Sequence, residues 1–155
     1  MKKLLIPIGL AGIGFGVYTY IKTQLDIFKN TKFKIIKIKK DSISLKKIDL
    51  ELYIQVINDS SITFKITDYF FNVTTDNLII GEVKNSTINQ VIKGDGNISY
   101  IPIKVSLNTA DLIVGALSGI RNKEIIVDGY FGIKKGIFKY KNIKVLETIK
   151  LNDYL

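Results

Sequence analysis

Cysteine and histidine are both absent from this chain of 155 residues. Without cysteine the chain cannot form disulfides or carry a lipid on a thiol, and the redox state of its compartment stays open. A zinc site is not expected, because cysteine and histidine supply most of the ligands of protein-bound zinc. The serines likewise have no histidine to activate them as nucleophiles. We therefore expect no metal, no cofactor and no enzyme activity.

Arginine is almost absent as well. Arg121 is the only one, so the formal net charge of +9 comes from lysine. A nucleic-acid-binding protein more often carries arginine, which binds bases and phosphates through paired hydrogen bonds. Here lysines alternate with apolar residues, as in Phe33–Lys39, a pattern typical of a solvated sheet face. We therefore do not expect a nucleic-acid partner; attraction to an anionic membrane or a nucleic acid is the alternative interpretation.

The stretch from Lys47 to Asn58 indicates the fold class. Apolar residues occupy every second position, and polar residues fill the positions between them. A side-chain period of two fits a strand with one buried and one solvated face, whereas a helix would scatter the same residues around its circumference. The stretch ends in the turn-forming residues Asn58–Ser61, and alternation resumes at Ile62. This arrangement predicts an antiparallel sheet folded over one core.

Other alternating stretches predict the remaining strands, and one segment departs from them. From Thr109 to Gly119 the apolar residues fall on one helical face, which predicts a short helix linking two sheets. Lys93–Asn97 is the strongest turn signal. The further strands are expected at residues 33–39, 42–45, 62–67, 69–75, 78–83, 87–92, 101–107, 124–131, 136–140 and 143–149.

The N-terminal segment is uncharged from Leu4 to Ile21. As a helix, such a run reaches about 27 Å at 1.5 Å per residue, close to the roughly 30 Å hydrocarbon core of a bilayer. Tyr18 and Tyr20 lie at its end, where amphipathic rings favour the membrane interface. We therefore predict an uncleaved, single-pass transmembrane helix that contacts the lipid bilayer through residues 4–21. A cleaved signal peptide is the alternative, although Val17–Lys22 lacks the small residues of a cleavage site.

Gly12 and Gly16 form a pair of small residues on this segment. Such pairs let transmembrane helices approach closely, although ordinary glycine enrichment in membrane helices is the plainer explanation. Lysines flank both ends of the run, so they set its orientation poorly. We expect the domain to lie outside the cytoplasm, because a short N-terminal anchor usually serves to display the domain attached to it. The chain would then divide into an anchor and linker, residues 1–30, and one domain of about 120 residues, residues 31–155.

Several short motifs occur along the chain in a recognisable order. They are Val56–Ser60 with the turn residues Asn58, Asp59 and Ser60, then Ile66–Phe70, Ile79–Gly81, Pro102–Val105, Asp111–Ile113 and Ile126–Tyr130. In this order, residues from about Phe33 to Leu151 resemble the group 2 late-embryogenesis-abundant proteins, also called the water-stress and hypersensitive-response domain. The turn lacks the proline of the family pattern, and the last strand pair is rearranged.

This resemblance implies a seven-stranded antiparallel β-sandwich of immunoglobulin or fibronectin-III type with one short crossing helix, behind an N-terminal transmembrane helix. It also implies a non-enzymatic role in desiccation or stress protection, exerted by binding or stabilising proteins or membrane surfaces. The alternative is a structural or assembly component of a cell-envelope complex or of a virus particle that contains a membrane. Either role involves a protein partner or self-association, and no small-molecule substrate is evident.

Two features could indicate sites, and each has a plainer explanation. Asp49 and Glu51 share a strand face about 7 Å apart, a spacing that two catalytic carboxylates could use. We interpret them instead as part of a solvated sheet face. In Tyr69–Phe71 the outer two residues are expected in the core and Phe70 on the opposite face, where an aromatic binding platform is the minority interpretation.

Overall fold

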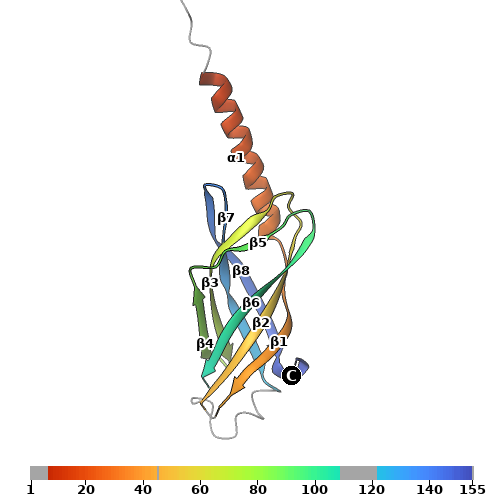
Figure 1. Ribbon diagram of the computed structural model, residues 1–155, viewed down its shortest axis with the longest axis vertical. Coiled ribbons are helices and arrows are strands. Elements are labelled where there is room, and N and C mark those ends of the chain that lie inside the picture. The colour runs from red at the N-terminus through yellow and green to blue at the C-terminus, as the bar shows by residue number, and fades with distance from the viewer. Residues whose placement is uncertain (1–6, 45, 109–121, 155) are drawn as a thin grey trace, which may run out of the picture.

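The computed structural model describes residues 7–44, 46–108 and 122–154, with the backbone alone for residues 7–13 and 43. Within these ranges the chain forms one long helix, α1 (Pro7–Lys29), and eight strands (Figure 1). The expected helix at 109–119 lies outside the described residues. The strands are β1 (Phe33–Ile43), β2 (Lys47–Asn58), β3 (Phe64–Thr75), β4 (Leu78–Asn85), β5 (Gln90–Ile92), β6 (Asn97–Asn108), β7 (Glu124–Lys135) and β8 (Phe138–Lys150), followed by the 3₁₀ turn η1 (Leu151–Asp153).

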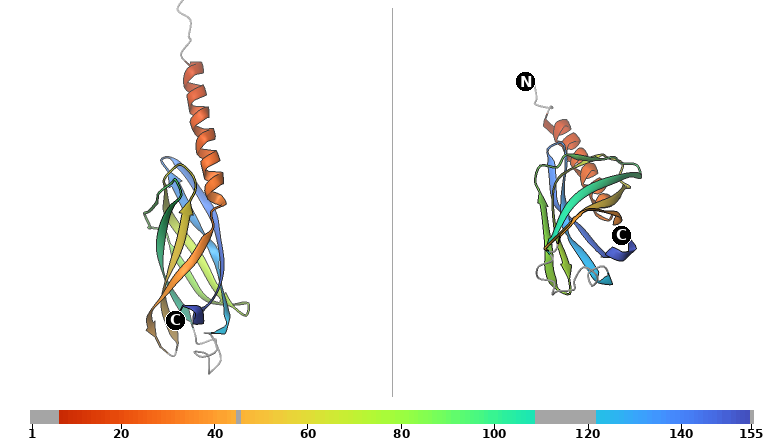
Figure 2. Two further views of the ribbon diagram at one scale, coloured as in Figure 1. Left: turned by 90° about the vertical axis from the view of Figure 1, so that its right-hand side faces the viewer. Right: turned by 60° about the horizontal axis from the view of Figure 1, so that its bottom comes forward.

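The strands form two antiparallel sheets that enclose one core. One sheet has the order β1-β2-β6, and the other has the order β4-β3-β7-β8 with β5 paired to β3. Apolar side chains from both sheets join in a single buried cluster. The sandwich part of the predicted fold is therefore consistent with the structure, although the described residues form eight strands where seven were predicted. Figure 2 shows α1 leaving one end of this sandwich.

Strand β2 has the alternation that the sequence predicts. The apolar side chains at every second position from Ile48 to Val56 are buried, while the residues between them are partly exposed. It lies between β1 and β6 in its sheet, with Ile54 opposite Ile35 on one side and Ile101 on the other. All three isoleucines are fully buried, so this face of the sheet supplies the centre of the core.

Three strands run on through positions where the sequence suggests a break. The predicted pairs 33–39 and 42–45, 62–67 and 69–75, and 136–140 and 143–149 become the continuous strands β1, β3 and β8. Shifts in register, which a β-bulge produces, accompany these junctions. Gly132 lies at one such shift, and a Cβ there would come 2.1 Å from a carboxylate oxygen of Asp68. A side chain at position 132 would therefore displace the Asp68 carboxylate.

The predicted transmembrane helix is wrong. In the part of the chain that the structure describes, no helix combines the length and the apolar character needed to span a bilayer. Leu4 lies outside that part, and α1 continues past Ile21 into a stretch containing Lys22, Asp26 and Lys29. These charged residues belong to the same helix and lower its mean hydropathy. The prediction of a single-pass membrane protein is corrected accordingly.

The last turns of α1 belong to the core of the sandwich. Phe28 is fully buried, with its ring centroid 4.8 Å from that of Phe64 in β3 and 6.3 Å from that of Phe33 in β1. One turn earlier, the side-chain oxygen of Gln24 accepts a hydrogen bond of 2.6 Å from the backbone N–H of Ser61. The base of the helix is thus held by apolar packing and by a polar contact with the β2–β3 turn.

Candidate functional site

The β7–β8 hairpin extends alongside α1 at one end of the sandwich (Figure 1). Its turn contains Gly136, whose φ of +58° lies in the left-handed region that glycine adopts most readily. Beside this turn, the ring centroid of Phe138 lies 6.1 Å from that of Tyr18 on the helix. Ile137 at the tip is 90 % exposed. The hairpin therefore presents apolar side chains both to the helix and to solvent.

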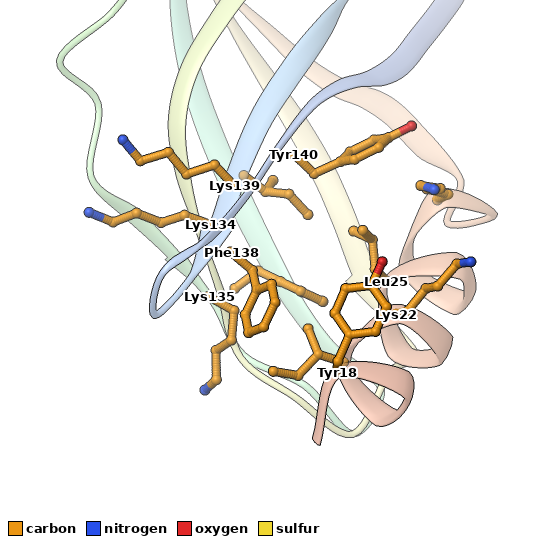
Figure 3. Close-up of a pocket in the computed structure, with 12 residues that line it drawn as sticks. Tyr18, Lys22, Leu25, Lys134, Lys135, Phe138, Lys139 and Tyr140 are labelled. Carbon is orange, nitrogen blue, oxygen red and sulfur yellow. The ribbon is translucent and has the colours of Figure 1, made fainter. Parts of the chain in front are cut away.

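A cleft of about 280 Å³ separates the hairpin from the helix. Figure 3 shows Phe138 between the two elements, with Tyr18 and Leu25 facing it from α1. The walls are mainly apolar, and lysines surround them. The lining residues are Tyr18, Ile21, Lys22, Leu25 and Lys29 of α1, Phe64 of β3, and Ile133, Lys134, Lys135, Phe138, Lys139 and Tyr140 of the hairpin.

The strand register explains which hairpin residues face the helix. Lys135 pairs with Phe138, and Ile133 pairs with Tyr140, so these two pairs share one face of the hairpin. The intervening pair, Lys134 with Lys139, belongs to the other face. In Figure 3 the side chains of Lys134 and Lys139 extend away from the helix. The hairpin face toward the helix thus carries Ile133, Phe138 and Tyr140 together with Lys135, whereas Lys134 and Lys139 lie on its outer face.

Most of these charges have no acidic partner. Lys29 is the exception, because its ammonium lies 3.0 Å from the Asp26 carboxylate and 4.2 Å from the centre of the Tyr140 ring. The hydrogen bond to Asp26 is the main cause of the raised pKa of Lys29. The other four lysines of the lining form no ion pair with any described residue. A partner with an apolar group and a nearby negative charge would suit this cleft.

The predicted carboxylate pair lies elsewhere, on the outer face of the sheet formed by β1, β2 and β6. Asp49 accepts hydrogen bonds from the hydroxyls of Ser106 (2.6 Å) and Ser42 (2.8 Å), and its carboxylate lies 3.0 Å from the Lys47 ammonium. These contacts, that of Ser106 first, lower the pKa of Asp49 to about 2. Glu51 instead accepts a hydrogen bond from the Tyr53 hydroxyl. Each carboxylate thus has its own partners on a sheet face.

The turn residues Asn58 and Ser60 are fully buried, and Asp59 between them is exposed. The Asn58 side chain accepts a hydrogen bond from the Ser60 backbone N–H (3.1 Å) and donates one to the Ile62 carbonyl (2.9 Å). The backbone N–H of Asp95 donates to the Ser60 carbonyl at 2.8 Å. This turn therefore joins the β2–β3 connection to the β5–β6 connection. Its correspondence to the family pattern stays a prediction.

The residues predicted to form the membrane anchor have different surroundings in the structure. Tyr18 and Ile21 line the cleft. Tyr20 is half exposed, as Tyr18 is, but lies outside the cleft lining. Gly12 and Gly16 both lie within α1, and nothing approaches within 4 Å of the position that a Cβ on Gly16 would take. The cleft itself was not predicted from the sequence. The recurrence of apolar residues at 18, 21, 25 and 28, three or four positions apart, was the available signal of a docked helix face.

The aromatic run in β3 lies as expected. Tyr69 and Phe71 are buried in the core, and Phe70 is half-buried on the opposite face, 6.0 Å from Tyr130 between ring centroids. Among the described residues no three acidic side chains gather closely enough to hold a metal ion.

Comparison with known proteins gives the class of fold. No protein-family model and no curated protein matches the chain. Among solved structures, one from Archaeoglobus fulgidus is similar over 76 % of this chain and 94 % of its own, with 12 % identity and a TM-score of 0.55. A protein from Arabidopsis thaliana, solved in solution, is similar over 81 % of this chain and 83 % of its own, with 16 % identity and a TM-score of 0.58.

A third similar structure is the structural-genomics target SoR45, with 15 % identity over 81 % of this chain and 89 % of its own, and a TM-score of 0.55. At such identities the likeness concerns the fold alone. The chain therefore shares the two-sheet β-sandwich class with these proteins. The resemblance to late-embryogenesis-abundant proteins stays a prediction.

Proposed function

We propose that this protein is a non-enzymatic β-sandwich module that binds other proteins and stabilises them under stress. The observation that supports this proposal best is the cleft between α1 and the β7–β8 hairpin. It combines apolar walls with four lysines that form no ion pair with a described residue, on a surface that is open to solvent. Contiguous exposed apolar surface marks an interaction site more often than a structural need.

The chemistry of the cleft suits a partly unfolded partner. Such a protein exposes apolar side chains that its own core would otherwise bury, and an apolar side chain could enter beside Phe138 and Leu25. Because Lys22 and Lys135 form no ion pair with described residues, they could attract acidic residues that flank this apolar side chain. The exposed lysines would also keep the complex in solution.

An aggregation assay tests this proposal. The full chain, added at equimolar amount, should slow the heat-induced aggregation of a reporter enzyme, measured by light scattering. Phe138→Ser should remove at least half of this protection, because it deletes the largest apolar group between the helix and the hairpin. Tyr100→Ser is the control, since Tyr100 is an aromatic residue that is more exposed than Phe138 and lies on β6. Absence of protection by the full chain, shown to be folded by circular dichroism, would contradict the proposal.

A structural or assembly role is the second candidate, and the free part of α1 favours it. The helix extends beyond the sandwich (Figure 1), and Phe15, Val17 and Tyr20 are each at least half exposed. An assembly component would cover these side chains with a partner held in fixed stoichiometry. Native mass spectrometry of the protein from its source would separate the two roles. A fixed-ratio complex that Phe15→Ser dissociates favours assembly, and a lone chain that protects the reporter favours stabilisation.

A further inference from the structure

Two sheet edges meet along one side of the sandwich. β1 is the last strand of one sheet, β8 is the last strand of the other, and the two strands contact each other. An edge strand presents backbone N–H and C=O groups that no neighbouring strand has paired. The C-terminal segment covers part of this side, because Leu151 is buried and the Tyr154 hydroxyl donates a 3.0 Å hydrogen bond to the Ile35 carbonyl.

The same contact shows which backbone groups of β1 face the free edge. The Ile35 carbonyl accepts its hydrogen bond from Tyr154, which lies outside the sheet. This indicates that Ile35 and Ile54 are a pair without mutual backbone hydrogen bonds. Hydrogen-bonded and non-hydrogen-bonded pairs alternate along an antiparallel ladder. Phe33 and Val56, two positions from Ile35 and Ile54, are therefore also a non-hydrogen-bonded pair. The N–H and C=O of Phe33 therefore point toward the edge as well.

A groove of about 470 Å³ remains open beside Phe33. It lies between residues 31–34, at the start of β1, and residues 144–147 of β8. Thr31 lines this groove, is only 8 % exposed, and has a side-chain hydroxyl without a hydrogen-bond partner among the described residues. A buried hydroxyl is normally paired, so this one indicates a missing partner. The groove thus offers both backbone and side-chain hydrogen-bonding groups.

The charge around the groove is positive. Lys32, Lys34 and Lys144 line it, are exposed, and form no ion pair with a described residue. Glu147 is the one acidic residue of the lining, and its pKa is raised by burial against the opposing influence of the Lys34 charge. Leu146, which is 68 % exposed, adds an apolar surface beside these charges.

We propose that the groove between the β1 and β8 edges binds an extended, acidic segment of a partner protein that adds a strand to β1. The segment would pair its main chain with Phe33, place an apolar side chain against Leu146, and direct carboxylates to the surrounding lysines. A second copy of this chain is a poorer occupant, because each copy carries a net charge of +9. This site lies apart from the cleft beside α1, so it goes beyond the proposed function.

Peptide binding to the full chain tests this inference. The probe is a fluorescein-labelled peptide that alternates valine with glutamate, and its binding is measured by fluorescence anisotropy. We expect the double variant Lys34→Glu with Lys144→Glu to weaken binding by about tenfold or more. The control Lys84→Glu with Lys104→Glu changes the net charge equally on exposed residues outside the groove, and should leave binding within about twofold.

Two further peptides test the mode of binding. A peptide N-methylated at alternate residues keeps its side chains but loses the N–H groups needed for strand pairing, and should not bind. A peptide that alternates valine with lysine should not bind either. The inference is overturned if the acidic peptide fails to bind, if either altered peptide binds as tightly, or if both double variants weaken binding equally. The reporter assay with Phe138→Ser is separate, so the failure of one proposal is distinguishable from the failure of the other.

Discussion

The sandwich core and the end formed by α1 and the β7–β8 hairpin use similar side chains in opposite ways. In the core, Ile54 and Phe131 are fully buried. At the end formed by α1 and the hairpin, Ile137 is 90 % exposed and Phe15 is 73 % exposed. Burial of apolar area is the main stabilising term in folding, so the exposed residues contribute little to it. Stability and binding should therefore be separable by mutation, because different apolar residues contribute to each.

The largest expected effect is in the core. Phe131→Ala should lower the free energy of unfolding by about 3–5 kcal/mol, because the ring is fully buried against Phe33, Tyr69 and Phe71 and its removal leaves a cavity. Urea denaturation measures this loss. The contrasting variant, Ile137→Ala at the exposed tip, should stay within about 0.5 kcal/mol of the unmodified protein. Equal losses in the free energy of unfolding in the two variants would contradict the claim that the core, and not the hairpin tip, carries the stability.

A polar core residue should have the next largest effect. Asn58→Ala removes the hydrogen bonds that hold the buried β2–β3 turn. It takes away the side-chain acceptor of the Ser60 backbone N–H, and leaves the Ile62 carbonyl with the Ser60 hydroxyl, at 3.2 Å, as its side-chain donor. We expect a loss of about 1–3 kcal/mol in the free energy of unfolding. Asp59→Ala in the same turn, where the side chain is exposed, should change little. A neutral Asn58→Ala would show that the turn does not depend on these hydrogen bonds.

The edge groove predicts a gain in stability. Thr31→Val replaces an unpaired, buried hydroxyl with a methyl group of similar size, and should raise the free energy of unfolding by about 1 kcal/mol. Thermal unfolding monitored by circular dichroism measures the gain. A loss of stability would mean that the hydroxyl has a partner in solution, and that the groove is filled.

The smallest effect concerns pH. The pKa of Asp49 is lowered from an ordinary value of 3.8 to about 2, chiefly by the hydrogen bond from Ser106. A lowered folded-state pKa contributes stability that is present above the unfolded-state value and is lost as the pH falls through the folded-state value. Asp49→Asn should therefore flatten the decline in stability between about pH 4 and pH 2. Asp59→Asn is the control, and identical pH profiles in all three proteins would contradict the assignment.

The sequence predicts the strands better than their junctions. Alternation alone identifies β2, because burial of one sheet face sets the period of two. It does not reveal that β3 continues through Asp68, since that bulge forms where β3 pairs with β7, a strand far away in the chain. The apolar N-terminal run likewise suggested a membrane span, because the docking of Phe28 against Phe64 is invisible until the chain is folded.

The candidate sites were predictable only in part. The cleft brings Tyr18 together with Phe138, and the groove brings Thr31 together with Leu146. Both juxtapositions join the start of the chain to its last strand pair, and no local pattern encodes them. The sequence does show the excess of lysine and the aromatic residues from which the sites are built.

Site-specific crosslinking tests most directly whether the exposed apolar end serves binding. A photoreactive amino acid at Ile137 in the hairpin would be compared with the same amino acid at Ile98 on β6, another exposed isoleucine. Each labelled protein would be irradiated with the heat-stressed reporter enzyme, and the crosslinked product quantified by mass spectrometry. The account predicts a crosslink from position 137 that greatly exceeds that from position 98. Equal yields at the two positions, or none at 137, would contradict it.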